Sequence, residues 1–343
     1  MALQALSIGA PYCEGKAVIV EVGDAPADRE ILRAVVQDRF ATLQRLLSVQ
    51  TDAKPANIRG PRTRVIEALA RWQQERAPDG EDEEVEKAGP LTVYHLSNSG
   101  QGPGIEIYPL PSNVVQFVKR AQGQRYRGVW NQTVRRAWEG KRREGEEPPE
   151  EERRALRNRF YDDLFTLPDN AGVFLRRWFN WRPEQIAGLT PETLLKQERW
   201  PFVVMFLEEV LRMEQVRVTA IRSLADRVAA DIADTNDRQI FRRFFSGRTD
   251  YRTVRDTLIR ADRRRVQRLG EPLVTLDDFL TVFEEGEEVA RADWRLAWDL
   301  LRIRMVEELC RLGWFQRPEG REIMSEVDRE EADEQAEEVG ATV

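Results

Sequence analysis

The glycine-rich segment 98–104, NSGQGPG, holds the side chains of this sequence that are best suited to recognition. Asn98 and Gln101 each provide an amide donor and an amide acceptor, which suits them to base edges or to backbone groups. The glycines of the segment let a backbone turn sharply and approach a ligand closely. Strands predicted at Thr92–Leu96 and Ile105–Tyr108 flank this turn, and a helix is predicted after the second strand. The sequence therefore predicts a recognition loop that is braced by a sheet and a helix.

A cluster of arginines is a second candidate for binding chemistry. Between Arg238 and Arg268 there are eleven arginines against three aspartates, a local excess of eight positive charges. Arginines in rows suit phosphates, because a guanidinium group pairs two oxygens at once. The alternative is a solvated face with internal ion pairs, but the few aspartates favour phosphate contact. The predicted phosphate-binding residues of this cluster are Arg242, Arg243, Arg248, Arg252, Arg260, Arg264 and Arg268, the last three in an i, i+4, i+8 row.

Another basic cluster lies between residues 119 and 143, where aromatic residues are interleaved with cations. Tyr126, Trp130 and Trp138 could stack on bases or wedge a duplex open. They could equally belong to a hydrophobic core, which is the commoner position of tryptophan, and the sequence leaves both possibilities open. The predicted phosphate-binding residues of this cluster are Lys119, Arg120, Arg125, Arg127, Arg135 and Arg136.

The elements that position these residues predict an α+β fold, in which a small mixed α/β N-terminal region with a short antiparallel sheet precedes an all-helical C-terminal bundle. A strand is predicted at Ala17–Val22, a mixed-charge insertion at Glu139–Arg154 and a long helix from Pro201 to Asp234. Further helices are predicted at Asp237–Phe245, Asp250–Leu269, Thr275–Glu284 and Ala292–Leu312. The predicted domains are a mixed region at 1–90, a sheet-and-loop region at 91–200, a helical bundle at 201–318 and an acidic disordered tail at 319–343.

The composition excludes several classes of protein. Of the 343 residues, 41% are hydrophobic and 33% are charged, the balance of a soluble, helix-rich protein. The longest apolar run, Pro201–Leu207, is too short to span a bilayer, and the N-terminus lacks the features of a signal peptide. Cys13 and Cys310 are the only cysteines, so a disulfide framework and a four-thiolate zinc site are excluded. The sequence predicts a cytoplasmic protein without a cofactor.

Catalytic chemistry finds little support in the sequence. His95 is the only histidine, which excludes histidine-paired nucleophiles and multi-histidine metal sites. No phosphate-binding GxxxxGK[ST] loop is present. Neighbouring carboxylates such as Asp162 and Asp163 could hold magnesium, but they lie on a predicted helix, where a solvated face or a cap is the commoner role. The sequence therefore predicts no catalytic residue, no metal site and no enzyme, with a carboxylate-metal nuclease as a distant possibility.

The motif SNSGQGPGIEIYPLP at residues 97–111, with the helical segment 206–229, resembles the large subunit of a type I CRISPR Cascade complex, in particular the Cst-type subunit of type I-B systems. The resemblance covers roughly residues 90–315. It implies a subunit of an RNA-guided surveillance complex that recognises the protospacer-adjacent motif (PAM) on double-stranded DNA, helps to open the duplex and stabilises the displaced strand. The implied partners are guide RNA, the backbone, capping and small subunits of Cascade, the target DNA, and a helicase-nuclease or transposition factor.

On this resemblance the PAM duplex would be contacted by Asn98, Ser99, Gly100 and Gln101. Without it, a structural turn whose amides satisfy local backbone groups would be the preferred interpretation of this loop. Large subunits of this family often carry a cysteine cluster before the motif, whereas Cys13 stands alone here, which indicates a compact variant. The alternative function is a helical scaffold that binds only proteins and needs the glycine loop only for folding.

Overall fold

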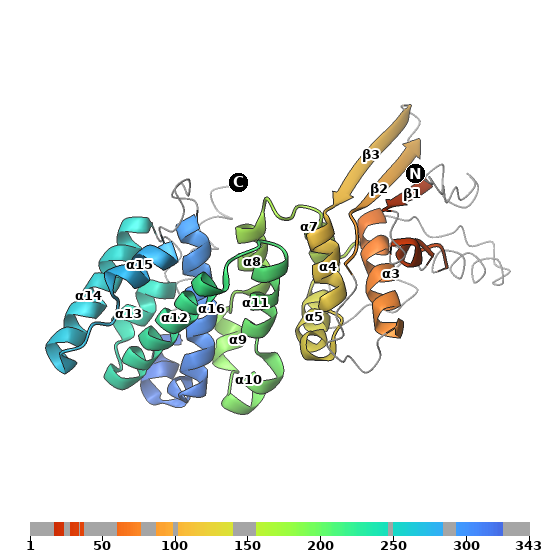
Figure 1. Cartoon of the computed structure of the whole chain (residues 1–343). Coiled ribbons are helices and arrows are strands. Elements are labelled where there is room, and N and C mark those ends of the chain that lie inside the picture. Colours follow the sequence, from red (N-terminus) through yellow and green to blue (C-terminus); the bar gives the residue numbers. More distant parts are fainter. Residues whose placement is uncertain are drawn as a thin grey trace. The chain divides into compact units, whose positions relative to one another are not determined.

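The structure is a computed structural model, and it describes residues 17–23, 28–33, 35–37, 60–76, 87–98, 102–139, 156–245, 250–283 and 293–324. It confirms the predicted α+β class, because a three-stranded antiparallel sheet lies in the N-terminal region and the C-terminal part is helical (Figure 1). The chain divides into two compact units. The first comprises Met1–Ala171 with Glu209–Leu211, and the second comprises Gly172–Glu208 with Arg212–Val343.

The sheet of the first unit has the strand order β1–β2–β3, with both pairs antiparallel (Figure 1). Its strands are β1 at Ala17–Val22, β2 at Leu91–Asn98 and β3 at Pro103–Leu110. Prolines at both ends of β3 suit its place at the edge of the sheet, because proline cannot donate a ladder hydrogen bond. Val93 of β2 and Leu110 of β3 are fully buried, so the sheet has one face on the core.

Besides a helical segment at residues 28–33 and 35–37, the described part of the first unit contains four labelled helices. The central one, α3 (Pro61–Arg76), packs against β2, α4 (Ser112–Arg120) and α7 (Arg159–Leu164). The fourth, α5 (Gln124–Arg136), packs against α7. Trp130 of α5 joins them in the core: its ring centroid lies 5.1 Å from that of Phe160, 5.8 Å from that of Tyr161 and 6.4 Å from that of Phe117. Helix α3 therefore packs against the sheet and supports the β2–β3 pair.

The chain segments on the two sides of the insertion predicted at Glu139–Arg154 lie next to each other. Trp138 and Asn158 form an antiparallel bridge on its two sides. The Asn158 side chain caps α7 by accepting a hydrogen bond from Tyr161 N–H, and the backbone N–H of Asn158 donates to Thr63 Oγ1 at 3.0 Å. The two ends of the insertion are therefore fixed to the core, while residues 140–155 lie outside the described residues.

The second unit is built on two long helices that pack together, α12 (Gln215–Thr235) and α16 (Asp293–Arg311). Val218, Ile221, Val228 and Ile232 form the buried apolar stripe of α12. The other elements are α8 (Ala171–Phe179), α9 (Pro183–Ala187), α10 (Pro191–Gln197), α11 (Trp200–Glu209), α13 (Arg238–Phe245), α14 (Tyr251–Leu269), α15 (Leu276–Phe283) and the 3₁₀ turn η1 (Trp314–Gln316).

The long helix predicted from Pro201 to Asp234 is wrong, because α11 and α12 are separate helices. Arg212, between them, has a left-handed backbone with φ of 55°, and the N–H of Met213 donates back to the carbonyl of Leu207 at 3.0 Å. The compact units also divide after Ala171, whereas the sequence placed a domain boundary after residue 200. Helices α8 to α10 belong to the helical unit, and Phe174, Ile186 and Leu194 are among the residues that they bury.

The tail predicted to be disordered from residue 319 begins in ordered structure. Residues 318–324 are helical, and both Ile323 and Met324 are buried. Burial of two apolar side chains holds this turn against the unit, so the prediction is wrong for residues 319–324; the rest of the tail lies outside the described residues. Among the helices that the structure describes, none is long and apolar enough to cross a membrane.

Candidate nucleic-acid interface

The predicted recognition loop connects β2 and β3 at one end of the sheet. Asn98 and Pro103 are the last paired residues of the two strands, so the loop between them connects the strands of a β-hairpin. Gly102 has φ of 121°, a conformation that glycine adopts without strain. Ser99, Gly100 and Gln101 lie outside the described residues, as does the side chain of Asn98.

A hydrogen-bonded cluster lies across the hairpin three residues before its end. His95 is opposite Glu106, and its Nδ1 lies 2.9 Å from Glu106 Oε2, to which the Tyr108 hydroxyl donates at 2.6 Å. The bond from Tyr108, followed by that from His95, holds the pKa of Glu106 below its ordinary value. Burial and the bond to Glu106 raise the pKa of Tyr108 to about 12. Arg62 lies 4.7 Å from the centre of the Tyr108 ring, so this cluster ties the hairpin to α3.

The aromatic residues of the 119–143 cluster belong to the core. Trp130 is only 1% exposed, and Tyr126 and Trp138 are buried as well. The sequence leaves open whether these rings stack on bases or pack in a hydrophobic core, and their burial favours the core. None of these three rings is therefore available on the surface to stack on a base.

The cations of the same cluster are dispersed rather than gathered on one face. Lys119 is 3% exposed, and its ammonium nitrogen lies 5.8 Å from the centre of the Trp72 ring. Arg120 forms an ion pair with Glu209, and Arg127 donates from Nε to the carbonyl of Gln122. These contacts give three of the predicted phosphate-binding residues roles within the fold. Arg125 and Arg135 are exposed on α5, and Arg136 is half-buried.

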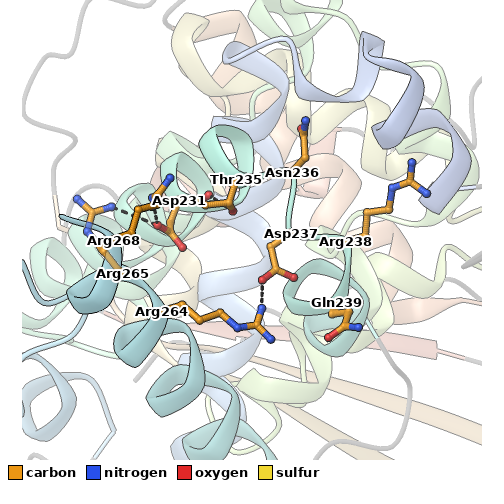
Figure 2. Close-up of a pocket in the computed structure, with 9 residues that line it drawn as sticks. All are labelled: Asp231, Thr235, Asn236, Asp237, Arg238, Gln239, Arg264, Arg265 and Arg268. Carbon is orange, nitrogen blue, oxygen red and sulfur yellow. Dashed lines mark hydrogen bonds and ion pairs between the residues drawn. The ribbon is translucent and has the colours of Figure 1, made fainter.

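In the arginine cluster of the second unit, two members of the predicted i, i+4, i+8 row form ion pairs (Figure 2). Arg264 pairs with Asp237, and Arg268 pairs with Asp231 at 2.7 Å. Arg265 lies 3.5 Å from the same Asp231. The prediction took into account only the aspartates between Arg238 and Arg268, whereas the partners lie at the end of α12 and at the α12–α13 junction. The spacing between the partners, 27 residues in one pair and 37 in the other, left no local signal.

The remaining arginines of α14 present an exposed face. Arg252, Arg260 and Arg263 are exposed, and no carboxylate of the described residues forms an ion pair with Arg260 or Arg263. On α13, Arg242 is exposed and Arg243 is half-buried. Arg248 lies outside the described residues. The exposed face of α14 is therefore the part of the predicted phosphate-binding cluster that carries the least internal pairing.

The carboxylates considered for magnesium have other partners. Asp162 forms an ion pair with Arg157 at 2.9 Å and lies 3.5 Å from Arg62. Burial raises the pKa of Asp162. Among the residues that the structure describes, no group of three or more histidine, cysteine, aspartate and glutamate side chains could hold a metal ion. These contacts give Asp162 a structural role at the start of α7.

Comparison of the chain with protein-family models, with curated proteins and with solved structures gives no match.

Proposed function

We propose that the chain is a non-catalytic, nucleic-acid-binding protein, and in its specific form the large subunit of a type I Cascade complex that recognises the PAM duplex. The observation that carries the binding role is the exposed arginine face of α14. The motif at residues 97–111 carries the specific form. In this role the protein works in the cytoplasm with guide RNA, the backbone, capping and small subunits, and a helicase-nuclease or transposition factor.

The charge of α14 supports phosphate binding even after its ion pairs are counted. The helix has seven arginines and two aspartates, and Asp231 and Asp237 bring two further negative charges to it. Asp250, the N-cap residue beside Arg252, adds a fifth negative charge, so seven positive charges against five negative ones leave a net of two. In addition, Oδ1 of Asp262 accepts hydrogen bonds from the N–H groups of Leu273 and Val274, at 2.7 and 3.1 Å. The surplus lies on Arg260 and Arg263, whose exposure leaves their guanidinium groups accessible to phosphates.

The β2–β3 hairpin supports a separate role in duplex recognition. A two-stranded ribbon fits a DNA groove, and amide side chains at its end can donate to and accept from base edges. The cluster of His95, Glu106 and Tyr108 links the two strands close to the loop, which limits the motion of its support. Asn98 and Gln101 in this setting would read a short motif, while the guide RNA reads the rest of the target.

The test of phosphate binding is a salt titration of the reconstituted complex on duplex DNA. The variant is Arg260→Gln with Arg263→Gln, and the matched control is Arg222→Gln with Arg295→Gln, two exposed arginines on other helices. Each lost phosphate contact lowers the slope of log K against log salt by about 0.9. We expect the first variant to lower the slope by roughly 1.8 and the control to leave it unchanged. Equal slopes in both variants would remove the α14 face from the proposal.

The test of motif recognition uses duplexes with a randomised flanking motif and the double variant Asn98→Ala with Gln101→Ala. Loss of motif selectivity, with the salt slope preserved, is the expected result. Selective binding that survives in this variant would contradict the assignment of the loop. A complex that assembles but has no guide-dependent or salt-dependent DNA affinity would favour the alternative, a helical scaffold that binds only proteins.

A further inference from the structure

A pocket of ≈ 480 Å³ opens where α12, α13 and α14 meet (Figure 2). Asp231 from α12, Asp237 from the α12–α13 junction, and Arg264, Arg265 and Arg268 from α14 are among the residues that line it. Arg238 also lines the pocket, but its side chain points away from these arginines in Figure 2. It forms an ion pair with Glu322 at 2.7 Å. The volume falls within the range of small-ligand sites, about 300–1,000 Å³, and can hold a single nucleotide.

The two aspartates hold the three arginines in place. Asp231 is 3% exposed and contacts both Arg265 and Arg268, and Asp237 pairs with Arg264 and also accepts the N–H of Ile240 at 3.0 Å. Each guanidinium group has five N–H donors, so three of them have far more donors than two carboxylates can accept. The pocket is therefore rich in fixed donors, and its three arginines and two aspartates leave one net positive charge.

An acceptor is missing at Arg265. Its Nε is buried and has no hydrogen-bond partner in the part of the chain that the structure describes. A buried donor without an acceptor costs free energy, so such groups usually have a partner or meet a ligand. The donor belongs to a residue that lines the pocket and that Asp231 already orients.

We propose that this pocket binds one phosphodiester group of a nucleic-acid strand between Arg264, Arg265 and Arg268, with Asp231 as a positioning residue. A phosphodiester carries one negative charge, which matches the net charge of the pocket, and its oxygens supply acceptors for guanidinium forks. The inference rests on the proposed function for the source of the phosphate. It adds a discrete anchoring point, distinct from the exposed residues Arg260 and Arg263.

The experiment measures binding of a thymidine trinucleotide to the full chain, by fluorescence anisotropy and by the NMR shift of the Arg265 Nε–H group. A trinucleotide with neutral methylphosphonate linkages and inorganic phosphate are the comparison probes. We expect the charged trinucleotide to shift the Arg265 signal and to bind at least tenfold more tightly than the neutral one. Arg265→Gln with Arg268→Gln should abolish this difference, and the control Arg222→Gln with Arg295→Gln should retain it.

Each contrary outcome overturns a defined part of the inference. Equal binding of the neutral trinucleotide would mean that no phosphodiester is recognised. A shift of the Arg265 signal by inorganic phosphate alone would make this a free-phosphate site. If Arg265→Gln with Arg268→Gln unfolds the protein, Arg264→Gln replaces it, since this side chain is half exposed.

The two proposals can fail separately. If the complex has the expected salt slopes but the trinucleotide does not shift the Arg265 signal, only the proposed phosphodiester site in the pocket is refuted. A trinucleotide that binds the pocket in a protein without duplex affinity refutes only the proposed function.

Discussion

Glu307 offers the sharpest test of the energetics of the second unit. The side chain lies on α16 and is 0% exposed, and its Oε1 accepts the N–H groups of Arg199 at 2.6 Å and Trp200 at 3.2 Å. It therefore binds the first turn of α11. Its Oε2 has no hydrogen-bond partner within the described residues. Burial raises the pKa of Glu307 from 4.5 to about 7.

The sign of the effect follows from this raised pKa. The folded chain holds the proton of Glu307 more tightly than the unfolded chain does, so the group favours folding most below pH 4.5. This contribution is lost as the pH rises through about 7. A tenfold change in proton affinity corresponds to about 1.4 kcal/mol, so the loss amounts to about 3 kcal/mol. Glu307→Gln keeps an accepting oxygen and removes the titration.

The assay is urea unfolding of the wild type and of Glu307→Gln at pH values from 4.5 to 8.5. We expect the stability of the variant relative to the wild type to rise by about 3 kcal/mol across this range. Glu214→Gln is the matched control, because Glu214 is exposed and its side chain makes no cap hydrogen bond. A difference between Glu307→Gln and wild type that stays constant with pH would refute burial as the cause of the raised pKa.

Three further predictions concern single contacts. Asn158→Ala removes the cap of α7 and the hydrogen bond from its side chain to the Val134 carbonyl, so we expect a loss of about 1–2 kcal/mol in urea unfolding. Tyr108→Phe removes the main cause of the lowered pKa of Glu106, so an NMR titration should find that pKa raised towards its ordinary value. Burial raises the pKa of the Cys310 thiol to about 11, so in a Cys13→Ser variant it should react with a thiol reagent at pH 8 only after unfolding.

Much of the fold could be predicted because its signals are local. The strands β2 and β3 flank a glycine turn, and the structure extends each strand by one or two residues beyond each predicted end. Helix α14 begins directly after Asp250, whose side chain accepts the N–H of Thr253 as an N-cap, and ends before Gly270 in a left-handed conformation. These residues mark helix ends by their own chemistry, so neither end needs tertiary information.

The break between α11 and α12 could not be predicted in this way. Residues 210–214, VLRME, contain neither glycine nor proline, and their apolar residues continue the helical spacing. The chain nevertheless adopts a left-handed backbone at Arg212. Nothing in the local pattern marks this break, because tertiary contacts can override helix propensity and a local pattern does not record them.

In the candidate site, too, local features could be predicted from the sequence and contacts between distant residues could not. The sequence identified the arginines of α14, because their density is visible in a short window. It could not identify Asp231 and Asp237 as partners, because the contact depends on how α12 and α14 pack. The aromatic residues of α5 present the same difficulty: composition places them beside cations, and only the fold places Trp130 in the core.

The net charge of −7 does not oppose phosphate binding at α14, because electrostatic interactions between exposed charges are local. Salt screens such interactions beyond about 8 Å at physiological ionic strength. A phosphate at Arg260 or Arg263 therefore responds to the charges around α14, where arginines outnumber the aspartates of the helix and of its two partners. Acidic segments elsewhere in the chain contribute to the total charge but only weakly to this local potential. The arrangement of charge around one helix, rather than the sum over the sequence, determines whether a strand can bind there.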